Sequence, residues 1–277
     1  MNKAESWGVP PDTVDKDWVL GHVIYSLFSL KKIRKNLLFK GGTALRKCYF
    51  PEYRFSEDLD FTTINSEFSF TMSDLNSIIE DCRHRSGILF HPGEIEPLRF
   101  NDKLMGFQTR LKFWGANHSK NQIPPAPERW TTGIKIEITL HEKVYFLPNF
   151  RKISHDYSDR WSEEIDIPCY DLKEIMAEKL RSLIQRSYTA PRDYYDVYSL
   201  IHEFSRDDWL QIKSAFIEKM EFKGLTFSGV NQFFIPENLK KAKSAWKNSL
   251  MYQVGIKNLP DFDMVIEHLK EILKTNF

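Results

Sequence analysis

Two aspartates alternate with apolar residues in the segment RFSEDLDF, which covers residues 54–61. Side chains of a β-strand point alternately to its two faces, so Asp58 and Asp60 are predicted on one face, about 7 Å apart, with Leu59 and Phe61 in the core. Carboxylates placed this way repel one another unless a cation lies between them, and hard divalent ions bind carboxylate oxygens. The pattern therefore predicts a Mg²⁺ site, and two Mg²⁺ ions would suit the phosphates of a nucleotide.

A glycine turn precedes these aspartates in the segment LLFKGGTALRK, residues 37–47. Its apolar run, its two glycines and the residues after them predict a strand, a tight turn and a helix. Glycines let the backbone approach a phosphate closely, and a helix that begins there presents free N–H groups to the anion. Either motif alone is common as an ordinary turn or a solvated strand face. Together they favour a nucleotide-phosphate site, to which we assign Gly41, Gly42, Thr43 and Ser56.

A third carboxylate is predicted in the segment GIKIEITL, residues 133–140, which also alternates. Its isoleucines share one face, which leaves Lys135, Glu137 and Thr139 on the other. If this strand neighbours the strand of Asp58, Glu137 completes a set of three metal ligands. Otherwise Glu137 is an exposed residue on a half-buried strand.

The elements around these motifs follow from the periodicity of the apolar residues. The first long element is predicted to be an amphipathic helix that follows the acidic segment 12–17 and ends near Asn36. A helix with a serine cap is expected over 73–85. Strands are expected over 55–63, 88–98, 106–114 and 133–140, with the proline-rich segment 116–129 as a loop that joins two strands of one sheet.

Helical periodicity dominates the rest of the chain. Helices are predicted over 171–186, 191–204, 207–220, 237–252 and 261–274. Strands early and helices late predict an α+β fold, with one domain at 1–168 and a helical domain at 169–277.

Charged residues interrupt the apolar faces of two of these helices. Lys179 lies within the apolar stripe of the helix over 171–186, and Arg186 lies on the same face. The side chain of Lys179 either extends along the stripe to solvent or reaches a triphosphate. Asp193 lies on the apolar face of the next helix, where we expect it to pair with Lys179 or Arg192. Asp196, at the edge of that face, is expected to be a structural partner of the helix dipole.

Four motifs together resemble the AbiEii/AbiGii toxin family of bacterial abortive-infection and toxin-antitoxin systems. They are KGGTAL at 40–45, RFSEDLDF at 54–61, EIMAEKL at 174–180 and PRDYYD at 191–196. The resemblance covers residues 37–200, and the helical segment after Phe204 carries no matching motif.

The resemblance implies a DNA-polymerase-β-like nucleotidyltransferase core that binds Mg²⁺ at Asp58 and Asp60. It places Gly42 and Thr43 near the phosphates and adds Lys179 and Asp193 to the catalytic residues. Because Arg186 shares a helix face with Lys179, we assign both to nucleotide binding. It also implies transfer of a nucleoside monophosphate from an NTP to an acceptor hydroxyl in phage defence or growth control, beside a cognate antitoxin. Some relatives modify the 3′ end of transfer RNA with pyrimidine nucleotides, and others favour GTP.

Other chemistries fit the same carboxylates. A metal-dependent RNA nuclease, an NTP-binding module without transfer, and nucleotide transfer onto a protein hydroxyl all remain open at this point. Lys240, Lys241, Lys243 and Lys247 surround Trp246 downstream of Phe233 and Phe234, which is typical of an RNA contact or, more often, of a solvated helix face.

The composition limits the remaining possibilities. With 39 basic and 38 acidic residues, the net charge of +1 excludes a protein held to nucleic acid by bulk charge, so any RNA contact must be local. Three dispersed cysteines without a CxxC pair favour the reducing cytoplasm. The histidines, including His118, His141 and His155, show no spacing typical of a metal site. No segment suits a signal peptide or a membrane span, so the protein is expected to be neither exported nor membrane-bound.

Overall fold

The computed structural model describes residues 3–116, 122–186, 191–255 and 257–277, which form two compact units. The first unit consists of Met1–Ser6, Pro10–Glu142 and Pro148–Cys169, and the second of Trp7–Val9, Lys143–Leu147 and Tyr170–Phe277. The division after Cys169 lies beside the expected boundary at 168. However, two short segments from the first part of the chain belong to the second unit.

The first unit is built around an eight-stranded mixed sheet in the order β3-β5-β6-β2-β1-β8-β7, with β4 paired to β5 outside this path. The strands are β1 (Leu37–Lys40), β2 (Asp58–Thr63), β3 (Leu89–Pro92), β4 (Glu96–Phe100), β5 (Lys103–Trp114), β6 (Gly133–Thr139), β7 (Asn149–Arg151) and β8 (Ile167–Cys169). Strand β2 is antiparallel to β1 and parallel to β6. The mixed sheet, followed by a helical unit, confirms the predicted α+β fold.

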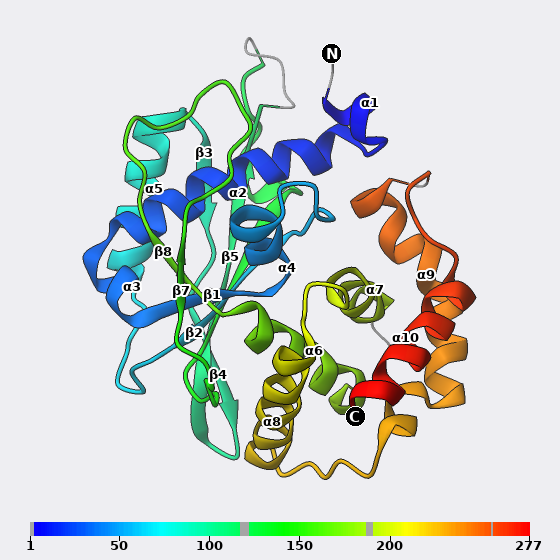
Figure 1. Ribbon diagram of the computed structural model, residues 1–277. Helices are drawn as coiled ribbons and strands as arrows, with labels where there is room; N and C mark the ends of the chain where they lie inside the picture. Colours follow the sequence, from blue (N-terminus) through cyan, green and yellow to red (C-terminus); the bar gives the residue numbers. More distant parts are fainter. Residues whose placement is uncertain (1–2, 117–121, 187–190, 256) are drawn as a thin grey trace. The chain divides into compact units, whose positions relative to one another are not determined.

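Helices α2 (Pro11–Ser29) and α5 (Met72–Ser86) supply the apolar cover of this sheet (Figure 1). Val23 and Phe28 of α2 and Ile78 of α5 join one buried cluster with Phe61 of β2 and Ile136 of β6. Alternate residues of β2 and β6 must then face away from this cluster, on the polar side of the sheet. Helix α5 begins at a Thr71–Asp74 capping box, so the cap is Thr71 and the predicted serine is wrong.

The first long helix is shorter than predicted. Leu30 has an extended backbone (φ −72°, ψ 117°), so α2 ends at Ser29 and a separate helix, α3 (Lys31–Asn36), leads into β1. The helical spacing of apolar residues continues through Leu30, so it predicts one continuous helix. The extended backbone of Leu30, which turns the chain toward the sheet, does not change this spacing. A further short helix, α1 (Lys3–Trp7), precedes α2.

The strand predicted over 88–98 is two strands. Both β3 and β4 pair antiparallel with β5, and the chain between them leaves the ladder at Gly93. The Gly93 N–H donates to the carbonyl of Arg110 at 2.9 Å, and Thr109 Oγ1 donates to the carbonyl of Gly93 at 3.2 Å. Pro92 has no N–H for the ladder, which makes this a natural point for the pairing to lapse.

The second unit is helical. It contains α6 (Leu172–Gln185), α7 (Pro191–Leu200), α8 (Arg206–Phe222), α9 (Pro236–Val254) and α10 (Phe262–Asn276), with a 3₁₀ helix at Val230–Phe234. Its core includes the clustered rings of Phe216, Phe227, Phe233 and Phe277. All five predicted helices are present, with α7 ending four residues before the predicted 204.

A buried ion pair explains why Lys143–Leu147 belongs to this unit. Glu174 of α6 and Lys219 of α8 are both 0% exposed and 2.5 Å apart. Glu174 Oε2 accepts the N–H groups of Tyr145 (2.9 Å) and Phe146 (2.8 Å), and Lys219 donates to the carbonyl of Lys143. The segment therefore satisfies two charges that would otherwise be costly to bury.

Candidate active site

Asp58 and Asp60 lie half-buried on the polar face of β2. Leu59 and Phe61, between and after them, are 0% exposed and belong to the core. The alternation predicted from the sequence is therefore the one the strand adopts. One face of β2 carries the core, and the other carries two carboxylates.

Strand β6 brings Glu137 beside them. The pairing of β2 and β6 sets Asp60 opposite Glu137 and Asp58 opposite Lys135, so all four side chains share a face. The condition stated for Glu137, a strand next to that of Asp58, is thus met. Asp58, Asp60 and Glu137 together form an acidic ledge.

Lys135 is a cation within this ledge that the sequence did not single out. Its Nζ lies 2.5 Å from Glu137 Oε2. Partial burial would lower the pKa of Lys135, but the hydrogen bond and charge of Glu137, with the charges of the two aspartates, raise it above its ordinary value. A lysine therefore offsets part of the repulsion among the carboxylates.

The glycine turn lies at the end of β1, directly beside Asp60. Lys40, the last residue of β1, is opposite Asp60 in the antiparallel register. Gly41 has φ +80°, and a Cβ there would lie 2.5 Å from Asp60 Oδ2. A Cβ on Gly42 would meet Arg54 Nη2 at 2.9 Å and Ser56 Oγ at 3.0 Å. Only glycine fits at 41, because both the backbone angle and the space exclude a side chain.

The side chain of Thr43 is buried and hydrogen-bonded within the protein. Thr43 is 1% exposed, and its Oγ1 donates to the backbone carbonyl of Asp58 at 2.5 Å. The hydroxyl is thus committed to β2, where it holds the backbone of the first ledge residue in place. Ser56 remains half-buried next to Gly42.

A buried cluster supports the turn from behind, and sequence reasoning missed it. The short helix α4 (Gly41–Ala44) continues into a π-helix at Leu45–Tyr49, which carries Arg46 and Lys47. Asp17 of α2 pairs with Arg46 Nε at 2.8 Å and with Lys47 Nζ at 2.7 Å, and all three residues are at most 5% exposed.

The acid of this cluster is strongly perturbed. Burial alone would raise the pKa of Asp17, but the charges of Lys47 and Arg46 lower it to about 2. The Tyr157 hydroxyl, which donates to Asp17 Oδ2 at 2.8 Å, acts in the same direction. Asp17 is therefore ionised at neutral pH and fixes the helix that follows the glycine turn.

The gap between β3 and β4 opens a cavity of about 260 Å³ on the same sheet. It is lined by Gly93, Glu94, Glu96, Gln108, Thr109, Arg110 and Lys135. Lys135 of β6 lies between two register partners. Arg110 of β5 is opposite it on one side, and Asp58 of β2 is opposite it on the other. A row of two cations thus leads from the cavity to the acidic ledge.

The second unit contains the other predicted charges. Lys179 Nζ lies 3.0 Å from Asp193 Oδ1, which confirms the predicted pairing, and Arg186 rather than Arg192 is the second partner of Asp193, at 2.8 Å. Asp196 is 0% exposed and 2.7 Å from Lys179. The dipole role predicted for Asp196 is wrong, because Asp196 lies beyond the first turn of α7 and pairs with the half-buried Lys179 instead.

The solvated helix face favoured for the lysines near Trp246 is confirmed, and the alternative of a base-stacking surface is wrong. Phe233, Phe234 and Trp246 are 0%, 9% and 5% exposed, so their rings are core and cannot stack a base. The four lysines near Trp246 remain exposed on α9. Of the histidines, His118 lies outside the described residues, whereas His155 meets His22 and Asp159 in the first unit.

The ledge fits a magnesium ion by its donors. Three carboxylates on neighbouring strands offer the hard oxygen ligands that Mg²⁺ prefers, and the missing Cβ of Gly41 leaves room at Asp60. Among the described residues, no helix is both long and apolar enough to cross a membrane.

Comparison with known proteins adds two findings on family and fold. The family described as "Nucleotidyl transferase AbiEii toxin, Type IV TA system" matches residues 22–268. MenT4, a nucleotidyltransferase toxin from Mycobacterium tuberculosis H37Rv, has a similar structure, with a TM-score of 0.54 and 18% sequence identity over 95% of this chain and 93% of that chain. At this identity the likeness concerns the fold. No curated protein matches the chain.

Proposed function

The chain belongs to the AbiEii family of nucleotidyl transferase toxins of type IV toxin-antitoxin systems, and from this premise we propose how it performs the transfer. It moves a nucleoside monophosphate from an NTP to an acceptor hydroxyl at the acidic ledge. The observation that supports this most is the register that sets Asp60 opposite Glu137 beside Gly41.

Each part of the ledge has a task in this proposal. Asp58, Asp60 and Glu137 hold Mg²⁺, which when bound activates the acceptor oxygen and neutralises the charge of the departing pyrophosphate. Gly41 and Gly42 let the backbone approach the phosphates, with Ser56 beside them. The Thr43 hydroxyl keeps Asp58 in position by donating to the backbone carbonyl of Asp58. The cluster of Asp17, Arg46 and Lys47 keeps the glycine turn rigid.

We also propose that Lys179 takes part in the transfer and that Asp193 orders its ammonium group, as the family resemblance implies. Arg186, on the same helix face as Lys179, contributes to nucleotide binding in this proposal. Lys179→Arg keeps the charge that Asp193 and Asp196 require, so the variant should fold. Its transfer rate should nevertheless fall about tenfold or more, because a guanidinium does not reproduce the compact ammonium. Lys173→Arg, at a half-buried lysine of the same helix that pairs with Asp208 of α8, is the control. Normal transfer by Lys179→Arg would reduce Lys179 to a structural residue.

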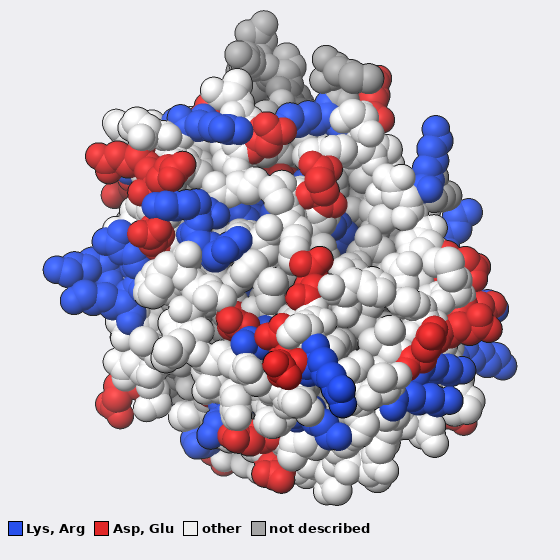
Figure 2. All heavy atoms as spheres, in the orientation of Figure 1, with Lys and Arg blue, Asp and Glu red and all other residues white. Residues whose placement is uncertain are grey.

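The acceptor we propose is the 3′ end of an RNA such as transfer RNA, reached in the cytoplasm and opposed by a cognate antitoxin. Figure 2 shows acidic and basic side chains intermixed over the face in view, in keeping with a net charge of +1. Binding must therefore depend on local groups. Arg110 and Lys135, in register beside the ledge, are suited to hold a phosphate of the RNA backbone.

Arg110→Gln tests this assignment. The variant should bind RNA more weakly, and the slope of log affinity against log salt concentration should fall by about 0.7 to 1, the contribution of one phosphate contact. NTP binding should not change. Arg83→Gln, on α5 at the opposite face of the sheet, should leave the slope as it is. An unchanged slope in Arg110→Gln would remove Arg110 from the acceptor site.

The function itself is tested by incubating the chain with each α-labelled NTP, Mg²⁺ and total cellular RNA, and separating the products by size. Lengthened, labelled RNA is the expected result. Shortened RNA would indicate a nuclease, labelled protein would indicate transfer onto a protein hydroxyl, and NTP binding without pyrophosphate release would indicate a binding module. Each of these three outcomes contradicts the proposal.

A further inference from the structure

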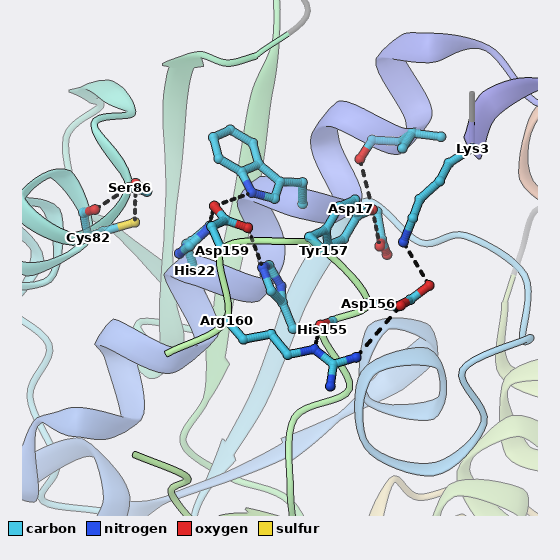
Figure 3. A network of polar contacts seen from close by, with 12 residues as sticks. Lys3, Asp17, His22, Cys82, Ser86, His155, Asp156, Tyr157, Asp159 and Arg160 are labelled. Atoms are coloured by element: carbon cyan, nitrogen blue, oxygen red, sulfur yellow. Dashed lines mark hydrogen bonds and ion pairs between the residues drawn. The ribbon is translucent and has the colours of Figure 1, made fainter. Parts of the chain in front are cut away.

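Two histidines and an aspartate converge in the first unit, and none of them belongs to the acidic ledge. His22 comes from α2, and His155 and Asp159 come from the loop between β7 and β8. Asp159 lies between the imidazoles, with Oδ2 3.0 Å from His22 Nε2 and Oδ1 3.4 Å from His155 Nε2 (Figure 3). One ligand atom of each residue lies within 4.8 Å of the other two.

The packing around these imidazoles fixes their orientation. The side chains of His22 and His155 are 3% and 2% exposed. The ring of His155 lies against Trp161 with centroids 4.5 Å apart, and against His22 at 4.8 Å. A Cβ on Gly21 would lie 2.3 Å from His155 Nδ1, so α2 carries a glycine where the imidazole lies against it. The packing therefore holds both imidazoles toward Asp159.

The donor set is typical of a transition metal. Two imidazoles and one carboxylate suit zinc-like ions, with a fourth position left for water. Asp159 is 40% exposed, which gives an ion a path to the buried nitrogens. Trp18 Nε1 donates to Asp159 Oδ2 at 2.8 Å, the kind of outer hydrogen bond that orients a ligating carboxylate.

The position of the proton on each ring sets a condition on ligation. Binding requires a lone pair on each Nε2, so a proton there must move to Nδ1 or to solvent. His155 Nδ1 is buried and accepts or donates no hydrogen bond among the described residues. Ligation through Nε2 therefore places the proton of His155 on Nδ1, the nitrogen that lies against Gly21.

We propose that His22, His155 and Asp159 form a binding site for one zinc-class divalent ion, separate from the magnesium site. The ion braces the loop that supports the glycine turn. Ser154 N donates to the carbonyl of Lys47 at 2.6 Å, and Tyr157 donates to Asp17, so the loop contacts the buried cluster behind Gly41. The site is thus a structural one.

The test is titration of the full chain with Zn²⁺ after treatment with a chelator, in millimolar Mg²⁺ so that the acidic ledge is occupied. Calorimetry should give one ion per chain, and the melting temperature should rise with Zn²⁺. Co²⁺ in place of Zn²⁺ should give the visible absorption of a four-coordinate nitrogen and oxygen site. Asp60→Asn, a change in the ledge, should bind Zn²⁺ like the original chain, which separates this proposal from the proposed function.

Asp159→Asn is the decisive variant, because the amide oxygen can still accept from Trp18 while the charged ligand is lost. Its Zn²⁺ affinity should fall at least about tenfold, and the thermal shift should vanish. His155→Gln should lose binding as well. Asp156→Asn, at a 71% exposed carboxylate three residues earlier, is the matched control and should bind normally. Failure of the original chain to bind Zn²⁺, or equal binding by Asp159→Asn, overturns the proposal.

Discussion

Replacement of Asp60 by asparagine is expected to lower nucleotide transfer by about three orders of magnitude while the protein stays folded. Asparagine keeps the volume and an acceptor oxygen but removes the charge at the centre of the ledge, between Lys40 on β1 and Glu137 on β6. The rate constant of the transfer step itself should fall, and single-turnover measurements with saturating NTP report it. Growth inhibition on expression should disappear with it.

Asp102→Asn provides the control for Asp60→Asn. Asp102 lies in the exposed turn between β4 and β5 with φ 61°, a conformation that asparagine also tolerates. The control should transfer nucleotides normally, and both variants should give the circular dichroism spectrum of the original chain. An active Asp60→Asn protein would remove the ledge from the reaction, and an unfolded one would make Asp60 a structural residue.

Replacement of Asp17 by asparagine is expected to destabilise the first unit by about 3 to 5 kcal/mol. The change leaves Arg46 and Lys47 buried without the acid that neutralises them. Urea unfolding followed by circular dichroism measures the loss. Asp81→Asn, which breaks an exposed pair with Arg85 on α5, should cost about 0.5 kcal/mol or less. A similar small cost for Asp17→Asn would contradict the assigned role.

The pH dependence of unfolding provides a second signature of Asp17. Because its pKa in the folded protein is lowered to about 2, its contribution is fully present above the unfolded value of about 3.9 and is lost as the pH falls through 2. This contribution amounts to about 2 to 3 kcal/mol. The original chain should lose it between pH 4 and pH 2, and Asp17→Asn should not.

The acidic ledge could be predicted from the sequence because it depends on local alternation. Asp58 and Asp60 flank a core leucine, and Glu137 flanks core isoleucines, so the face of each side chain follows from its own strand. Only the pairing of β2 with β6 had to be supplied by the fold. Lys179 and Asp193 were found in the same way, as charges on apolar helix faces.

Features that depend on contacts between distant segments could not be predicted. Asp17 meets Arg46 and Lys47 across 29 and 30 residues, and His22 meets Asp159 across 137, and no spacing in the sequence marks these meetings. The direction of the Thr43 hydroxyl depends on the carbonyl of Asp58, which only the folded turn brings within reach. Strands β7 and β8 have three residues each, too few for an alternating pattern to appear.

The contact between Gly41 and Asp60 has an evolutionary consequence. A methyl group on residue 41 would displace the carboxylate, so bend and acid cannot drift independently. Under the proposed function, a single substitution at residue 41 would therefore inactivate the toxin by moving a metal ligand, while the apolar core stays unchanged.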